Sequence, residues 1–188
     1  LEPHMHSNRL ALYSQRMAAV TLVFMVAMMV VNAVAWLYPE AASRYGLGFA
    51  LTERQLSSLP EETMRLTGWQ RLGGILLTSI PLLALAVGLT NLRRLFKHYA
   101  QGQYFSTAAA VYLGNAGRAV ALWVLLDFIC EPFLSLLVTI NAPVGQRLLT
   151  FSITAPSFVA LFLAACIAII ARILSQASEI DSENRTFV

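Results

Sequence analysis

Two acidic residues, Asp127 and Glu131, lie inside a long apolar stretch that runs from Ala119 to Ile140. Their i, i+4 spacing puts both carboxyl groups on one face of a helix. Ionisable groups at membrane depth are costly and therefore need a partner or a function. This pair is the only local chemistry in the chain that asks for a functional explanation.

Three further residues complete a candidate intramembrane polar site. Pro132 follows Glu131 and cannot donate to the carbonyl of Phe128, which leaves that oxygen free to accept. Thr78 and Ser79, in an earlier apolar stretch, fall near the depth of Glu131 and are expected to be its hydroxyl partners. Three interpretations stay open: a neutral carboxyl pair that holds helices in register, a proton or cation site, and an acid–base or ligand-binding site.

Other catalytic signals are missing from the sequence. His98 is the one histidine well away from the N-terminus, so a bis-histidine haem or an imidazole metal site lacks ligands. No Cys-x-x-Cys, His-Glu-x-x-His, Gly-x-Ser-x-Gly or phosphate-binding glycine loop is present. We therefore expect no catalytic residue, no metal and no cofactor, and an enzyme is the less favoured class.

Composition sets the fold class. The chain has 188 residues, of which 57% are hydrophobic and only 12% are charged, about half the charged share of soluble domains. Roughly 20 apolar residues cross a bilayer core, and four stretches have that length: 17–38, 69–92, 119–140 and 153–173. We predict an all-α, polytopic membrane protein with a four-transmembrane-helix bundle, forming one domain over residues 6–188. Residues 1–5 are interpreted as a cloning remnant.

Basic residues predict the orientation of the spans. Eight of the 13 lysines and arginines fall on the side that carries both termini, and five on the other. Because positive charge concentrates on the cytoplasmic side, both termini are predicted to be cytoplasmic.

The longer outer loop, residues 39–68, contains two capping-box patterns, Thr52-Glu-Arg-Gln55 and Ser58-Leu-Pro-Glu61. Each predicts the start of a helix, and the second helix is expected to continue into the second span. Two interpretations stay open for the partly alternating segments 45–52 and 147–154: they pair as a short outer two-stranded ribbon, or each is irregular or lies along the membrane surface.

The second span is predicted to continue past the membrane as a helix. Gly102 is its expected stop and Ser106 the cap of the next helix. The resulting hairpin carries a basic surface that could contact lipid headgroups or a cytoplasmic protein partner: Arg93, Arg94, Lys97 and His98.

Three stretches of the sequence form a recognisable combination. They are the hairpin sequence Leu92-Arg-Arg-Leu-Phe-Lys-His-Tyr-Ala-Gln-Gly-Gln-Tyr-Phe-Ser106, the segment Leu113-Gly-Asn-Ala-Gly117 and the ending that closes on Glu183-Asn-Arg-Thr-Phe-Val188. Together they resemble a bacterial family of four-span inner-membrane proteins. That family is catalogued as a domain of unknown function. Arg185 stands where its usual tail motif has leucine. The resemblance implies no activity, but some relatives are encoded beside a small helix-turn-helix regulator, which favours a regulatory or partner-binding role.

Three function hypotheses follow. The first is a regulator, immunity factor or accessory subunit that works through protein contacts. The second is a small proton- or cation-coupled transporter that uses Asp127 and Glu131. The third is a membrane enzyme with that pair as acid and base. The expected partners are the lipid bilayer, a cytoplasmic protein and a second copy of the chain, with no direct nucleic-acid contact.

Overall fold

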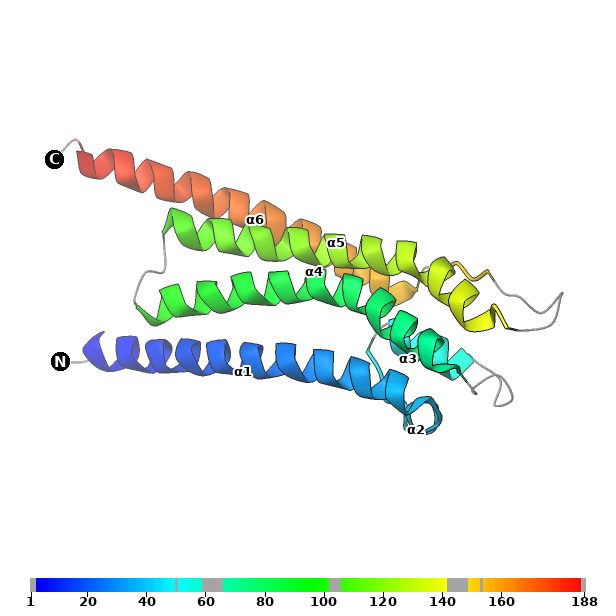
Figure 1. Cartoon of the computed structure of the whole chain (residues 1–188). Helices are drawn as coiled ribbons and strands as arrows, with labels where there is room; N and C mark the ends of the chain where they lie inside the picture. Colours follow the sequence, from blue (N-terminus) through cyan, green and yellow to red (C-terminus); the bar gives the residue numbers. More distant parts are fainter. Residues whose placement is uncertain are drawn as a thin grey trace. The chain divides into compact units, whose positions relative to one another are not determined.

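The computed structural model describes residues 3–49, 51–58, 66–101, 106–141, 149–152 and 154–186. Within these ranges the chain is helical and contains no strand (Figure 1). The helices are α1 (Pro3–Leu37), α2 (Pro39–Tyr45), α3 (Leu51–Ser58), α4 (Gly68–Ala100), α5 (Thr107–Thr139) and α6 (Ala155–Thr186). Four of them, α1, α4, α5 and α6, are long and apolar enough to cross a membrane. The all-α class and the four predicted spans are confirmed, and the protein is a multi-pass membrane protein.

Each long helix extends beyond the stretch predicted to span the membrane. α5 begins at Thr107, twelve residues before the predicted start at Ala119, and α4 continues to Ala100. The Ser106 hydroxyl accepts a hydrogen bond from the backbone N–H of Ala109 at 3.2 Å, which confirms its capping role. Gly102, the expected helix stop, lies outside the described residues.

The chain divides into two compact units. The first unit consists of Leu1–Met25, Leu85–Ala121 and Phe158–Val188. The second consists of Val26–Ala84 and Leu122–Ser157.

Small residues allow the helices of the first unit to approach closely. A Cβ added at Gly88 of α4 would lie 2.9 Å from the Ala119 Cβ of α5. One added at Gly117 of α5 would lie 3.1 Å from the backbone oxygen of Ala164 in α6. Such contacts are typical of helix pairs in membranes, where small side chains permit backbone approach.

The second unit has an apolar core beneath the two short helices. Trp36 at the end of α1 is fully buried, and Leu51 and Leu56 of α3 are each 1% exposed. Leu134 and Val138 of α5 belong to the same cluster. α2 contributes Ala42 to this core. It starts at a proline, whose φ already suits a helix, and is capped by Gly46, whose φ of 61° is left-handed.

The predicted outer ribbon is wrong within the described residues. Its first segment is divided between the end of α2, a short irregular stretch and the start of α3, because Leu51 and Leu56 bury together on one face of a helix. In its second segment the backbone N–H groups of Thr150 and Ser152 donate to side chains of α5 instead of to another strand.

The expected helix from Ser58 into the second span is also interrupted. Leu66 and Thr67 are not helical, and α4 starts at Gly68. Residues 59–65, on which the rest of this prediction falls, lie outside the described residues. Leu66 is buried in the apolar core, so the chain is held there before α4 begins.

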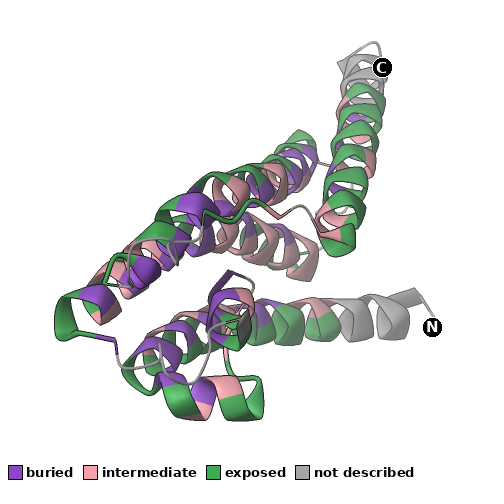
Figure 2. Ribbon diagram, turned by 90° about the vertical axis from the view of Figure 1, so that its right-hand side faces the viewer, coloured by how far each residue is buried: buried purple, intermediate pink, exposed green. Residues whose placement is uncertain are grey.

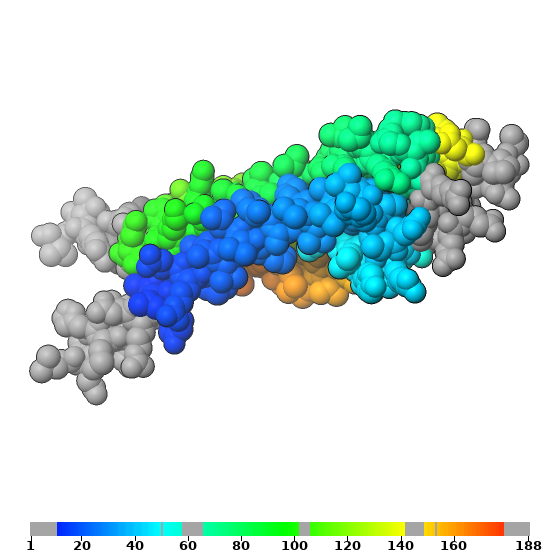
Figure 3. Space-filling model, turned by 60° about the horizontal axis from the view of Figure 1, so that its bottom comes forward, coloured from blue at the N-terminus to red at the C-terminus, as the bar shows by residue number. Residues whose placement is uncertain are grey.

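Two of the long helices expose much apolar surface. α6 is green, that is exposed, along most of its described length in Figure 2. Only 11% of its most apolar 18-residue stretch is buried. α1 lies uncovered on the face shown in Figure 3, with Val23 67% and Val30 54% exposed. In a membrane protein such faces meet lipid or another membrane helix.

Candidate functional site

The two carboxylates of α5 are both buried in the second unit. Asp127 is 6% exposed and Glu131 is 2% exposed. The helix continues through Pro132, which is itself buried, so the two acids keep their places one turn apart. Burial of this degree requires partners for the oxygens, because water is excluded from them.

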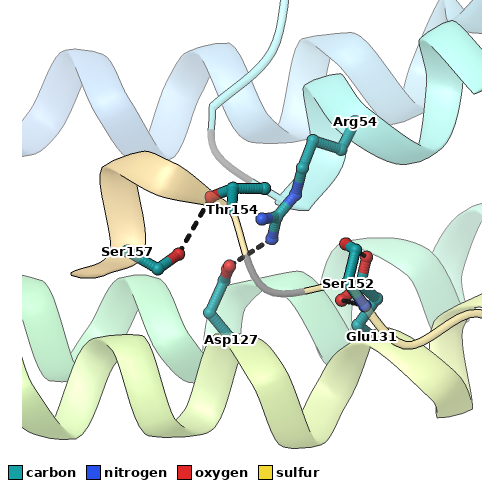
Figure 4. Close-up of polar contacts among 6 residues, drawn as sticks. All are labelled: Arg54, Asp127, Glu131, Ser152, Thr154 and Ser157. Atoms are coloured by element: carbon teal, nitrogen blue, oxygen red, sulfur yellow. Dashed lines mark hydrogen bonds and ion pairs between the residues drawn. The ribbon is translucent and has the colours of Figure 1, made fainter. Parts of the chain in front are cut away.

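Arg54 supplies the partner of Asp127. It projects from α3, and its Nη2 donates to Asp127 Oδ2 in an ion pair (Figure 4). The side chain of Arg54 is 27% exposed and that of Asp127 is 9% exposed. The Arg54 guanidinium therefore reaches from α3 to a buried anion and supplies a compensating charge.

Ser152 supplies both partners of Glu131. The Ser152 backbone N–H donates to Glu131 Oε2 at 3.0 Å, and its hydroxyl donates to Oε1 (Figure 4). One turn further along α5, the Ser135 hydroxyl accepts from the Thr150 backbone N–H at 3.1 Å. Two polar side chains of α5 thus hold the segment 149–152 that precedes α6.

Two buried atoms at the ion pair have no hydrogen-bond partner among the residues that the structure describes. They are Asp127 Oδ1 and Arg54 Nε. A carboxylate oxygen without a donor is a site where a proton or a water molecule would be accepted. The pair between Arg54 and Asp127 is consequently less fully satisfied than the contact between Ser152 and Glu131.

A second polar group in the same unit joins α1, α3 and α4. Trp36 Nε1 donates to the Thr52 hydroxyl at 3.2 Å, and that hydroxyl donates to Asn32 Oδ1. Asn32 Nδ2 donates to the Thr78 hydroxyl at 3.1 Å, which in turn donates to the Gly74 carbonyl at 2.7 Å. Every side chain of this relay is at most 1% exposed. We call these residues the Asn32 relay.

The Asn32 relay changes the role predicted for two residues. Thr52 was expected to cap a helix, but α3 begins one residue earlier, at Leu51, and the Thr52 hydroxyl is turned into the relay. The Thr78 hydroxyl bonds within the relay as well. Among the described residues neither Thr78 nor the half-buried Ser79 donates to Glu131, whose oxygens accept from Ser152.

Gln70 fastens the start of α4 to the end of α5. Its Nε2 lies 3.1 Å from the Leu137 carbonyl and 3.2 Å from the Val138 carbonyl. Carbonyls in the last turn of a helix have no partner within that helix. At the other end of the same side chain, Gln70 Oε1 accepts from the Thr67 backbone N–H at 2.9 Å.

The predicted basic surface lies on the last turns of α4, in the first unit. Arg94 and Lys97 are exposed, whereas Arg93 and His98 are half-buried. The His98 ring packs against Tyr112 of α5 with centroids 5.3 Å apart, so it helps to join α4 to α5. The side chains of the acidic tail residues Glu179, Asp181 and Glu183 lie outside the described residues.

The described residues contain no group of three or more His, Cys, Asp or Glu side chains that could hold a metal ion. The site is built instead from one ion pair, one carboxylate held by a serine and one amide–hydroxyl relay. Such an arrangement fixes outer segments to membrane helices.

A family model described as "Protein of unknown function (DUF2975)" matches residues 29–188. The chain belongs to this family. The DUF2975 match covers the hairpin after α4, the helix α5 with both carboxylates, and the C-terminal tail, so the family resemblance found in the sequence is confirmed. No curated protein and no solved structure matches the chain.

Sequence reasoning missed the partners of both carboxylates. Arg54 is 73 positions from Asp127 and Ser152 is 21 positions from Glu131. A signal was present for Arg54, since a buried acid needs a countercharge and few basic residues lie in the outer loops. A signal also existed for Asn32, because it interrupts the apolar run Met-Met-Val-Val-Asn-Ala-Val of the first span.

Proposed function

We propose that this DUF2975 protein is a membrane-embedded regulator or accessory subunit that works through protein contacts. The observation that carries the proposal is that both α5 carboxylates are engaged by outer segments of the same chain, Asp127 by Arg54 and Glu131 by Ser152. The acids then serve to hold the outer part of the second unit in one arrangement.

The exposed apolar faces are consistent with that role. α6 carries large exposed side chains such as Phe158, Val159 and Phe162, at 61%, 57% and 69%. A second membrane helix could pack there, either from another protein or from a second copy of the chain. We further propose that the protein resides in the bacterial inner membrane with both termini cytoplasmic, on the strength of the eight-to-five distribution of basic residues.

The experiment is site-specific photo-crosslinking in living cells. A photoreactive residue at Phe162 should give one discrete crosslinked product, either a heterologous protein or a dimer. The Asp127→Asn, Glu131→Gln double variant should keep that product, because amides retain the shape and most hydrogen bonds of the acids. Only diffuse lipid adducts at Phe162, and at Val23 on the uncovered face of α1, would contradict a role through protein contacts.

A second candidate function is proton coupling at Asp127. It is favoured by one observation, the buried Asp127 Oδ1 that has no hydrogen-bond partner. Proton flux into liposomes that contain the purified protein tests it. If the Asp127→Asn variant still folds but shows no proton flux, transport becomes the better-supported function.

A further inference from the structure

The first unit contains a basic groove between α5 and α6. Its volume is about 530 Å³. We call it the Arg118–Arg172 groove. Its lining consists of Ala110, Val111, Gly114, Asn115 and Arg118 from α5, and Ala168, Ala171, Arg172 and Ser175 from α6.

The groove exists because the two helices pack through small residues. A Cβ added at Gly114 would lie 3.4 Å from the Ala171 Cβ, and the Thr107 and Ser178 hydroxyls are 2.9 Å apart. These two contacts fix an antiparallel register in which Gly114 lies level with Ala171. Because alanine and glycine make up much of both walls, the groove stays open beside these contacts.

The two arginines line the groove at different depths. Arg118 is four residues beyond Gly114 and Arg172 is one residue beyond Ala171 in the opposite direction, which separates them by about 7.5 Å along the helix axes at about 1.5 Å per residue. Long arginine side chains can bring both guanidinium groups to one anion across that interval. The Asn115 side chain orients one of them, since Arg118 Nη1 donates to Asn115 Oδ1 at 3.3 Å.

Neither arginine has a countercharge among the described side chains. The ion pair that the described residues contain joins Arg54 to Asp127, in the other unit. Both Arg118 and Arg172 are exposed. The described lining of the groove thus carries two positive charges and no carboxylate, which suits it to bind an anion.

The depth of the groove in the membrane decides which anion. Arg118 directly precedes the apolar run that begins at Ala119, and Arg172 falls at the end of the apolar run of α6. The spans predicted from the sequence therefore put both arginines at the level of the lipid headgroups. Apart from Asn115 and Ser175, the rest of the lining is apolar. Ile169 and Ile173 of α6 are 61% and 59% exposed, so acyl chains would find contact surface next to the charges.

We propose that the Arg118–Arg172 groove binds the headgroup phosphate of an anionic phospholipid, with an acyl chain along the exposed face of α6. Basic pockets between membrane helices are suited to such headgroups. The proposal is independent of the partner-contact function and places the ligand in the first unit, away from the carboxylates of α5.

Native mass spectrometry of the full chain in detergent tests the proposal. Phosphatidylglycerol should be retained in preference to phosphatidylcholine with the same acyl chains. The Arg118→Gln, Arg172→Gln double variant should bind phosphatidylglycerol about 30-fold more weakly, from the attraction of two basic residues to an anionic headgroup. The matched control, Arg16→Gln with Arg44→Gln, removes two exposed charges that belong neither to the groove nor to the basic surface of α4, and it should change binding less than about 3-fold.

A second variant keeps both charges and fills the space. Ala168→Leu should reduce retention of phosphatidylglycerol, whereas Ala165→Leu, on an exposed position of α6 outside the lining, should not. Equal losses in the two arginine pairs, or no preference between the lipids, would overturn the proposal. Displacement of the lipid by millimolar inorganic phosphate would also overturn it, since it would identify a pocket for a free anion.

Discussion

The Asn32 relay gives the most quantitative prediction. Asn32→Leu replaces a side chain that is 1% exposed with an apolar one of similar size. The Thr78 hydroxyl keeps the Gly74 carbonyl as acceptor, and Trp36 Nε1 keeps the Thr52 oxygen. The Thr52 hydroxyl alone loses its acceptor, so we expect a loss of about 1–3 kcal/mol in the free energy of unfolding, the usual cost of one orphaned buried group.

Thr52→Val should be similarly or more damaging. It removes the acceptor of Trp36 Nε1, which is left unpaired, and one of the two donors to Asn32 Oδ1, which keeps only the 3.2 Å contact from the Thr78 hydroxyl. In the Asn32→Leu, Thr52→Val double variant only the indole N–H is left unpaired. The loss in the free energy of unfolding of the double variant should therefore be about 1–2 kcal/mol smaller than the sum of the two single losses, which is within the range measured for residues in contact.

Unfolding in increasing mole fraction of SDS, followed by circular dichroism, measures these differences. Thr90→Val is the matched control, because Thr90 lies in the other unit, where it donates to the Ala86 carbonyl and contacts Met25. Its effect should add to that of Asn32→Leu within about 0.5 kcal/mol. Additivity between Asn32→Leu and Thr52→Val would refute the relay.

Three further predictions concern neighbouring contacts. Arg54→Met should lower the free energy of unfolding by about 2–4 kcal/mol, because it leaves the buried Asp127 carboxylate without a countercharge. Asp127→Asn should cost less, since the Arg54 side chain is 27% exposed and can be hydrated. A larger loss for Asp127→Asn than for Arg54→Met in the SDS titration would contradict this order. Ser152→Ala should cost about 1 kcal/mol in the free energy of unfolding, because the hydrogen bond to Glu131 is lost. Ser57→Ala should cause no measurable change, because Ser57 is exposed and bonded only within α3. Equal effects of the two substitutions would show that the Ser152 contact does not stabilise the protein. Gly74→Ala should lower the midpoint of unfolding, because its Cβ would lie 2.5 Å from the Trp36 ring; Gly68→Ala, with nothing within 4 Å, should not, and a harmless Gly74→Ala would mean that Trp36 packs elsewhere.

The membrane helices could be predicted from the sequence because the physics that selects them is local. A bilayer core needs an unbroken apolar run of sufficient length, and four such runs are visible by inspection. The ends of the helices were less predictable. α5 begins at Thr107 because Ser106 caps it and alanines follow, and neither feature depends on where the membrane starts.

The segments between the long helices could not be predicted from local sequence patterns. The alternation in residues 45–52 is equally compatible with a strand and with the helix that the structure contains from Leu51. The outcome is decided by tertiary contacts, since Leu51, Thr52 and Leu56 are all buried against the core. Similarly, polar side chains of α5 accept hydrogen bonds from the backbone of residues 149–152. Secondary-structure propensities do not predict such contacts.

The need for partners could be predicted at the candidate site, but not their identity. Asp127 and Glu131 were recognised as expensive from their position alone. Thr78 and Ser79 were the expected partners because they lie at a similar depth, yet depth does not fix the direction of a side chain around a helix. The Thr78 hydroxyl is directed to Asn32 and Gly74, and Arg54 reaches the site from a helix outside the spans.

The central structural claim is that Arg54 of α3 is the counter-ion of Asp127 of α5. Solid-state NMR in lipid bilayers can measure the distance between the ¹³C-labelled Asp127 carboxyl carbon and the ¹⁵N-labelled Arg54 guanidinium, with Asp127→Asn used to assign the carboxyl signal. The expected result is a separation of about 4 Å or less, as in a hydrogen-bonded ion pair. A separation beyond about 6 Å would show that α3 does not hold this carboxylate and would contradict the account.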